Sequence, residues 1–210
     1  MKRFRQVVVA FAVVAVITGF AANTAHAAAI NLTSPGDEYS SGLYTLGFEF
    51  TVSSPFTVGS LGVYDSGQDG LPSAANVAIW LASGGAPLVS AVVGSGTMGE
   101  LDNFFRYVGI APLTLTPGTH YVIGAYLPVG TASSYNTLQG GSGTVDPTVT
   151  IVVDRYSPFD SAFGFPSSSS VAGGAWLGGN FRVAAAPEPA SILLLGLGLL
   201  GLARQRRQRG

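Results

Sequence analysis

His120 is the only histidine between residues 28 and 186, and that part of the chain has no lysine and no cysteine. Hydrolysis by a serine nucleophile needs a base beside the hydroxyl, usually histidine or lysine. Zinc and iron sites need several histidine, cysteine or carboxylate ligands that converge. One histidine in a predicted strand, directly before Tyr121, fits an exposed or packed side chain better than a catalytic base. We therefore expect a protein that is not an enzyme.

Asp65 and Asp69 lie in a short loop rich in turn-forming residues, which ends at Pro72. Carboxylate oxygens in a Gly-containing loop suit a hard cation such as Ca²⁺. The loop departs from the EF-hand pattern, because residue 67 is glycine and residue 76 is asparagine where that pattern has acids. Asp and Gly also favour turns for backbone reasons alone. Two interpretations stay open: a loop that binds Ca²⁺, and a structural turn in a protein without a cofactor.

Neighbouring carboxylates could act as an acid and a base in sugar cleavage, and the chain has two such pairs, Glu100 with Asp102 and Asp37 with Glu38. That mechanism needs two carboxyl groups about 5 to 9 Å apart across a cleft. Adjacency in the sequence indicates no cleft. A carboxylate-based glycosidase is therefore the weaker alternative function.

Aromatic side chains could contact sugar rings if they lie exposed on a sheet. Four have a suitable type: Trp80, Trp176, Tyr135 and Tyr156. Trp80 alternates with the apolar positions on either side of it, so it is either exposed or packed under a loop. A carbohydrate-binding module is the main alternative function, with glycan contacts at Trp80 and Trp176.

The elements that position these residues are predicted to be β-strands. The clearest pattern runs from Leu43 to Val52, where apolar residues alternate with Thr45, Gly47, Glu49 and Thr51. A period of two predicts a half-buried strand with the apolar set inward. Similar patterns, separated by Gly- and Pro-rich turns, predict strands over 43–52, 56–64, 76–82, 88–93, 103–110, 119–127, 148–156 and 180–183, with a hairpin joining 76–82 to 88–93.

The segment Leu115-Thr-Pro-Gly-Thr-His-Tyr121 has the spacing of a tyrosine corner. In that Greek-key feature a Tyr hydroxyl bonds to backbone a few residues upstream. The alternative is a plain Pro-Gly turn with a core Tyr. Short strands, frequent turns and no helical periodicity outside the termini predict an all-β fold, an antiparallel β-sandwich of jelly-roll or immunoglobulin-like type. The irregular Gly/Ser-rich segments 133–146 and 157–179 are predicted to be surface loops.

The charge of residues 28–186 is acidic, with three bases against ten acids, a formal −7. Such a domain lacks the basic footprint of a nucleic-acid partner. Without cysteine it has no disulfide, so its core must hold it together.

The amino terminus is basic, the run Val7 to Ala22 is apolar, and Ala25-His-Ala27 is a small-x-small site. These three regions predict a secretory signal peptide, residues 1–27, cleaved after Ala27, and an amino-terminal membrane anchor is the alternative.

The carboxyl terminus has three parts in order: Pro187-Glu188-Pro189, an uncharged apolar run from Ala190 to Ala203, and the arginines Arg204, Arg206, Arg207 and Arg209. A helix of about fourteen residues is roughly 21 Å long, short of the roughly 30 Å hydrocarbon core. Positive charge beside a membrane segment favours the cytoplasmic face. The tail is therefore predicted to be a short helix that contacts the inner membrane transiently, and an ordinary transmembrane helix is the alternative.

This tail resembles the PEP-CTERM sorting signal of Gram-negative bacteria. The resemblance implies that exosortase, a membrane transpeptidase-like enzyme, cuts near the Pro-Glu-Pro and releases or transfers the protein. The segment from about Leu46 to Leu127 is similar to the DUF4082 family, on residues such as Leu61-Gly-Val-Tyr64-Asp65 and Val77-Ala-Ile-Trp80. That family implies a β-sandwich and no catalytic residues.

Together these features predict three parts: a signal peptide at 1–27, a β-sandwich at 28–186 and a sorting signal at 187–210. We expect a protein exported through the inner membrane to the cell envelope, the outer surface or the medium. Its sandwich would have a structural or interaction role, associated with exopolysaccharide or biofilm.

Overall fold

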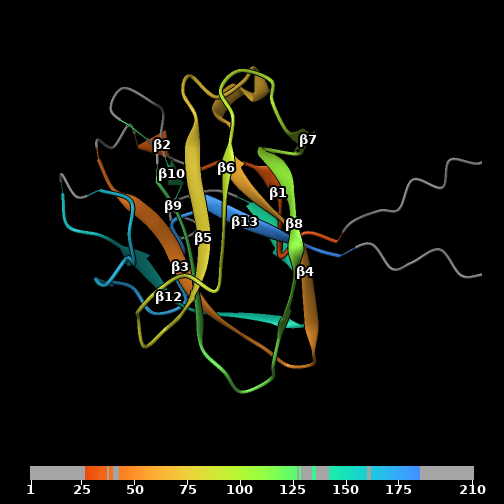
Figure 1. The fold of residues 1–210 in the computed structure, drawn as a ribbon, viewed down its shortest axis with the longest axis vertical. Coiled ribbons are helices and arrows are strands. Elements are labelled where there is room, and N and C mark those ends of the chain that lie inside the picture. Colours follow the sequence, from red (N-terminus) through yellow and green to blue (C-terminus); the bar gives the residue numbers. More distant parts are fainter. Residues whose placement is uncertain are drawn as a thin grey trace, which may run out of the picture. The chain divides into compact units, whose positions relative to one another are not determined.

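Alternating apolar residues build two facing antiparallel sheets (Figure 1). The computed structural model describes residues 27–36, 38–39, 43–126, 128, 134–135, 142–159 and 162–184. They all belong to one of the chain's two units, His26–Ala184. The first sheet has the order β12-β3-β9-β5-β6 and the second β13-β4-β8-β7. Two short pairs, β1-β11 and β10-β2, stand apart from them.

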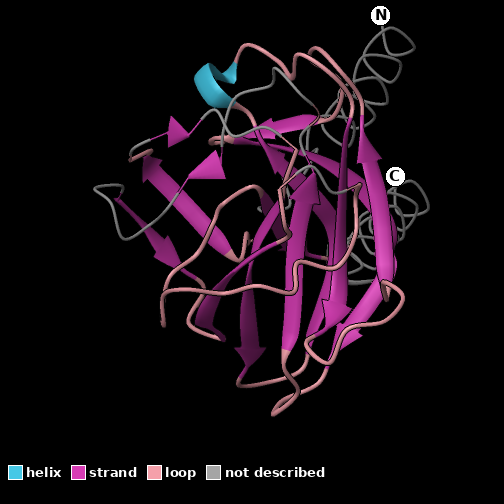
Figure 2. Cartoon of the chain, turned by 90° about the vertical axis from the view of Figure 1, so that its left-hand side faces the viewer, coloured by secondary structure: helices cyan, strands magenta, loops and turns pink. Residues whose placement is uncertain are grey.

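The strands have these bounds: β1 Ile30–Ser34, β2 Glu38–Tyr39, β3 Thr45–Val52, β4 Phe56–Tyr64, β5 Ala75–Leu81, β6 Val89–Val93, β7 Glu100–Asp102, β8 Phe105–Leu115, β9 Tyr121–Tyr126, β10 Ser134–Tyr135, β11 Ser142–Val145, β12 Val149–Tyr156 and β13 Gly179–Val183. The helical structure among the described residues is one short turn, η1 Ser66–Gln68 (Figure 2). The predicted all-β sandwich is confirmed.

The connections identify the sandwich as a jelly roll. Ala28 bridges to Arg182, so the segment that leads into β1 lies beside β13 in the second sheet. We number eight elements in chain order: this segment is 1, and β3, β4, β5, β6, β8, β9 and β13 are 2 to 8. The second sheet then has the order 1-8-3-6 and the first sheet the order 2-7-4-5. That is the order of a jelly roll and not of an immunoglobulin-like sandwich. β12 and β7 extend the two sheets at their edges.

The core lies between the two sheets and is rich in aromatic residues. The rings of Phe50 on β3 and Phe181 on β13 have centroids 4.8 Å apart, so they join one sheet to the other. Gly179 allows the sheets to approach closely, because a Cβ there would stand 3.2 Å from Ile123 Cγ1 on β9. Buried apolar area of this kind supplies most of the folding free energy of a domain without disulfides.

The predicted tyrosine corner is confirmed at the β8–β9 connection, where the chain crosses from the second sheet to the first. The backbone N–H of Thr116 donates to the Tyr121 hydroxyl at 2.9 Å. Gly118 has φ of 75°, a value that glycine adopts without strain. The alternative of a plain Pro-Gly turn is therefore wrong.

The predicted strands over 43–52, 56–64, 76–82, 88–93, 148–156 and 180–183 match β3, β4, β5, β6, β12 and β13 to within two residues, and the β5–β6 hairpin is antiparallel as expected. The prediction for 103–110 is wrong at both ends. Asn103 and Phe104 form a turn, with Asn103 in the left-handed region, and β8 continues to Leu115. His120 lies just before β9 and not inside it.

The outer face of the first sheet is covered over β3, β9 and β5, which the sequence did not indicate. β3 is buried on both faces and not half-buried. The cover is the first part of the segment 162–178, a predicted surface loop, where Phe163 and Phe165 pack against Trp80. The end of the segment reaches the core, where Ala175 and Leu177 are buried. Two bridges, Val153 with Ala172 and Tyr156 with Ser168, fasten it along β12. Its backbone also bonds to β3, since Trp176 N–H donates to the Gly47 carbonyl at 3.1 Å. We call residues 162–178 the strap.

The second predicted loop, 133–146, contains β10 and β11, and β1 and β2 were also missed. β1 is held by Asn180, whose amide side chain accepts from the Ile30 N–H at 3.3 Å and donates to the Ile30 carbonyl at 2.7 Å. These four strands are short or polar, so alternation does not reveal them.

The predicted signal helix and the short helix of the tail lie outside the described residues, as do Ala25, Asp37 and everything after Ala184. Ala27 is described and exposed. Among the residues that the structure describes, no helix has the length and apolar character needed to span a membrane.

Candidate functional site

A cluster of three ionisable side chains lies on the outer face of the first sheet, beside the strap. Glu49 lies on β3, which has β9 on one side and β12 on the other. It is directly opposite Val122 of β9 and Val153 of β12. His120 is two residues before Val122, and Arg155 is two residues after Val153. Diagonal neighbours of this kind are within reach of long side chains, so the sheet register brings both cations to one carboxylate.

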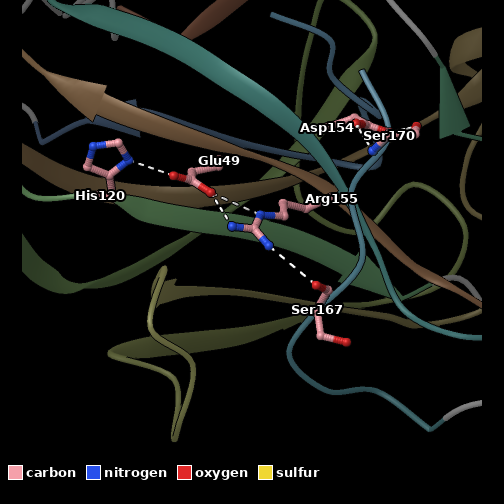
Figure 3. Close-up of polar contacts among 6 residues, drawn as sticks. All are labelled: Glu49, His120, Asp154, Arg155, Ser167 and Ser170. Atoms are coloured by element: carbon pink, nitrogen blue, oxygen red, sulfur yellow. Dashed lines mark hydrogen bonds and ion pairs between the residues drawn. The ribbon is translucent and has the colours of Figure 1, made fainter. Parts of the chain in front are cut away.

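The Glu49 carboxylate uses both of its oxygens (Figure 3). Oε1 lies 2.6 Å from His120 Nδ1, and Oε2 accepts from Arg155 Nε at 3.0 Å and also from Arg155 Nη2. Arg155 Nη1 donates onward to the Ser167 carbonyl of the strap at 3.4 Å. The cluster therefore joins β9, β3, β12 and the strap through one buried carboxylate.

The electrostatics keep Glu49 ionised. Burial alone would raise the pKa of Glu49, but the hydrogen bonds from Arg155 and His120, together with their charges, outweigh it and lower the pKa. His120 is the accessible member, with 52% of its side chain exposed. A carboxylate that orients an imidazole also occurs in hydrolases, but there the other ring nitrogen meets a nucleophile. Among the described residues, no hydroxyl forms a hydrogen bond with the His120 ring.

A second carboxylate, Asp154, anchors the strap more directly. It lies on β12, and it accepts four hydrogen bonds: from Ser170 N at 2.7 Å, Val171 N at 2.6 Å, Ser170 Oγ at 2.6 Å and Trp176 Nε1 at 3.0 Å. Figure 3 shows Asp154 beside Ser170. Burial would raise the pKa of Asp154, but these hydrogen bonds lower it. A carboxylate saturated with protein donors has a structural role.

In the loop proposed to bind a cation, the Asp65 carboxylate binds an arginine and a backbone N–H of the same domain. Asp65 is buried, its Oδ2 accepts from Arg106 Nε at 2.6 Å, and its Oδ1 accepts from Gly70 N–H at 3.2 Å. Asp69 is exposed in the same turn. In the part of the chain that the structure describes, no three His, Asp or Glu side chains gather as a metal site would require. These contacts favour the interpretation of a turn without Ca²⁺.

The suggested acid and base pair is also neutralised. Glu100 Oε1 and Asp102 Oδ2 lie 3.1 and 3.0 Å from the two terminal nitrogens of Arg182. The Arg182 guanidinium also lies over the Tyr107 ring, 3.8 Å from its centroid. Two carboxylates on one guanidinium form an ion pair and do not face each other across a bond to be cleaved. The side chain of Glu38 lies outside the described residues.

The two tryptophans that were candidates for glycan contact are part of the strap's attachment. Trp80 is 2% exposed, with its ring 5.6 Å from that of Phe163 and 6.2 Å from that of Phe165. It is therefore packed under a loop, one of the two alternatives for this residue, and it is not presented to a ligand. Trp176 is partly buried and donates to Asp154.

The sequence did not reveal the Glu49 cluster or the Asp154 anchor. A signal was present, since Glu49 is the one acid in the apolar run 43–52 and Asp154 is an acid within another predicted strand. Their partners are 71 and 106 residues away for Glu49, and 16 to 22 residues away for Asp154. The sheet register brings the partners of Glu49 together, and the path of the strap along β12 brings those of Asp154.

Fold and sites thus define a jelly-roll domain that uses its buried charges to fasten loops. Comparison with family models finds "Domain of unknown function (DUF4082)" over residues 32–181, and the chain belongs to this family. A PEP-CTERM protein-sorting motif follows at 185–207 and covers Pro187, Glu188 and Pro189. No curated protein and no solved structure matches the chain. The sorting motif indicates a secreted, cell-surface or extracellular protein of Gram-negative bacteria that exosortase processes. Its β-domain belongs to a family of unknown function.

Proposed function

We propose that this domain is a non-catalytic structural or interaction module of the cell surface or extracellular matrix, associated with exopolysaccharide. The observation that carries the proposal is the use of its charges. All three arginines of residues 28–186 bind carboxylates of the same domain: Arg106 with Asp65, Arg155 with Glu49, and Arg182 with Glu100 and Asp102. Groups that would be reactive in an enzyme are occupied here in holding the fold.

The position of the two ends supports attachment from one side. Val183 N–H donates to the Ala27 carbonyl at 3.0 Å, and Ala184 N–H donates to the Thr57 carbonyl at 2.7 Å. The chain therefore enters and leaves the domain at neighbouring positions. Whether the signal peptide or the sorting motif holds the protein, the same end of the domain would face the membrane, and the rest of its surface would be free for contacts.

The test uses the producing bacterium. Full-length protein is compared with a deletion of residues 187–210 and with the double variant Pro187→Ala, Pro189→Ala, whose apolar run and arginines are intact. We expect both variants to lose the mass shift of processing and the surface location. Digestion of the exopolysaccharide should release the processed wild-type protein into the medium. Unchanged processing and location of the deletion variant would contradict the sorting role, and retention after digestion would contradict the association with polysaccharide.

A carbohydrate-binding module is the second candidate, and one observation favours it. Phe159 is 66% exposed and its ring lies 5.4 Å from that of Tyr44. Tyr44 is partly buried, so Phe159 is the ring that offers a face on which a sugar ring can stack. Phe159→Ala should then abolish retention on a polysaccharide column, whereas Val145→Ala, an exposed apolar control, should not. Equal retention of Phe159→Ala and wild type would remove this candidate.

A further inference from the structure

β6 is an edge strand without a cover. The first sheet ends at β12 on one side, where the strap bridges to Val153 and Tyr156, and at β6 on the other, next to β5 (Figure 1). In the second sheet, Ala28 lies along β13 and the last strand, β7, has three residues. Among the described residues, two long edges are closed by no strand or bridge: β6, and residues 108–115 of β8, which lie beyond the three residues that β7 pairs. The edge of β8 carries Pro112, a residue that protects an edge, so we consider β6, whose free N–H and C=O groups can pair with another strand.

β6 also lacks the features by which proteins protect such an edge. The chain has no charged residue between Asp69 and Glu100, so the whole β5–β6 hairpin and the loop after it are neutral. Natural edge strands are usually protected by charges, by proline or by a bulge. The outward side chains here are instead uncharged: Leu88, directly before β6, is 42% exposed, Ser90 is exposed, and Val92 is 58% exposed. Met98, 64% exposed, lies over Gly94 directly after the strand.

We propose that a second copy of this chain pairs with β6 in antiparallel orientation, so that two five-stranded sheets become one continuous sheet. Along β6, Val89, Ala91 and Val93 point toward the core, whereas Leu88, Ser90 and Val92 point outward. A two-fold axis at Ser90 places Leu88 of one copy opposite Val92 of the other, and Val89 opposite Ala91. Each pair then lies on one face, as directly opposite residues in a sheet must.

Charge favours a second copy over a different partner. Residues 28–186 carry a formal −7, so two copies repel at most places on their surfaces. The β5–β6 hairpin is a neutral stretch, and there two acidic domains can approach without opposing like charges. A basic protein would find no acid on this hairpin to bind, and an anionic polysaccharide would find no base. A two-fold contact uses the same patch on both copies, so the neutral edge of one β6 meets the neutral edge of the other.

The experiment exploits the absence of cysteine from the chain. Exported, processed protein carrying Ser90→Cys is oxidised mildly and analysed on non-reducing gels. Opposite residues of an antiparallel pair have Cα atoms about 4.5 to 5.5 Å apart, within disulfide range. We expect a disulfide-linked dimer, whereas Val171→Cys, exposed on the strap, should remain monomeric. A Ser90→Cys protein that cross-links no faster than Val171→Cys, or that links to a different protein, would overturn the proposal.

A charge test provides an independent measurement on the unlinked protein. Ser90→Lys places two lysines opposite each other at the two-fold axis, and Ser90→Thr keeps a neutral side chain suited to a strand. By sedimentation over a wide range of concentrations, wild type and Ser90→Thr should dimerise and Ser90→Lys should not. Because Ser90 is exposed, all three should unfold at the same denaturant concentration when the protein is dilute enough for wild type to be monomeric. A wild type that stays monomeric, or a Ser90→Lys variant that dimerises equally well, would contradict the pairing.

Discussion

Asp154→Asn should loosen the strap and weaken the fold, because Asp154 accepts four hydrogen bonds from the strap. Asparagine keeps one acceptor oxygen, which can serve the Ser170 and Val171 amides. Its NH₂ group would then face Trp176 Nε1, donor against donor. Hydrogen bonds to a charged group contribute about 1.5 to 3 kcal/mol each, and a buried donor left without a partner costs about 1 to 3 kcal/mol. We therefore expect a loss of about 3 kcal/mol in the free energy of unfolding.

The measurement is urea unfolding followed by tryptophan fluorescence, which reports on Trp80 and Trp176 at the strap. Asp69→Asn is the matched control, because Asp69 is exposed, and it should change stability by less than about 0.5 kcal/mol. An Asp154→Asn variant that loses less than about 1 kcal/mol would refute the reasoning, since the four contacts would then contribute no more than an ordinary surface group.

The same variant should change the pH dependence. The pKa of Asp154 is lowered in the folded protein, so the unfolded chain binds its proton more tightly. This carboxylate therefore stabilises the fold above the ordinary pKa of aspartate, and the contribution is lost as the pH falls through that range toward the lower folded pKa. The pKa of Glu49 is lowered as well and acts in the same direction. Asp154→Asn should retain acid sensitivity from Glu49 but lose less stability on acidification than wild type.

Three further predictions concern the sandwich itself. Tyr121→Phe removes the acceptor of the corner's backbone N–H and should cost about 1 to 2 kcal/mol in urea unfolding; no change would mean that water replaces the hydroxyl. Gly47→Ala should prevent folding, because its Cβ would lie 1.7 Å from a carbonyl oxygen of β9. Gly109→Ala on β8 is the control, because its Cβ meets no atom within 4 Å, and it should express normally. Similar yields of soluble protein for the two variants would contradict this. Trp80→Ala should cost about 3 to 5 kcal/mol and expose the strap to limited proteolysis, and an equally resistant strap would show that the ring contacts do not hold it.

Much of the fold could be predicted because its signals are local. β4 was located at its observed bounds by the two turns that flank it, and the tyrosine corner by a seven-residue pattern ending at Tyr121. The sorting motif was identified in the same way, from consecutive residues. β1 was missed because its alternation is short, with only Ile30 and Leu32 as apolar residues, and β11 because it is exposed throughout and has no apolar period. Their pairing depends on each other and on Asn180, far along the chain.

Local chemistry in the sequence was sufficient to determine an exported, cysteine-free, all-β chain with a sorting tail, because composition, strand period and terminal motifs are read residue by residue. Tertiary structure alone decided the roles of individual side chains. Trp80 and Glu49 both point away from the core by alternation, which suggests exposure, yet both are buried. Phe163 and Phe165 of the strap pack against Trp80, and His120 and Arg155 bind Glu49. The reason is physical: alternation specifies the face of a sheet on which a side chain lies, whereas burial depends on which distant segment folds over that face.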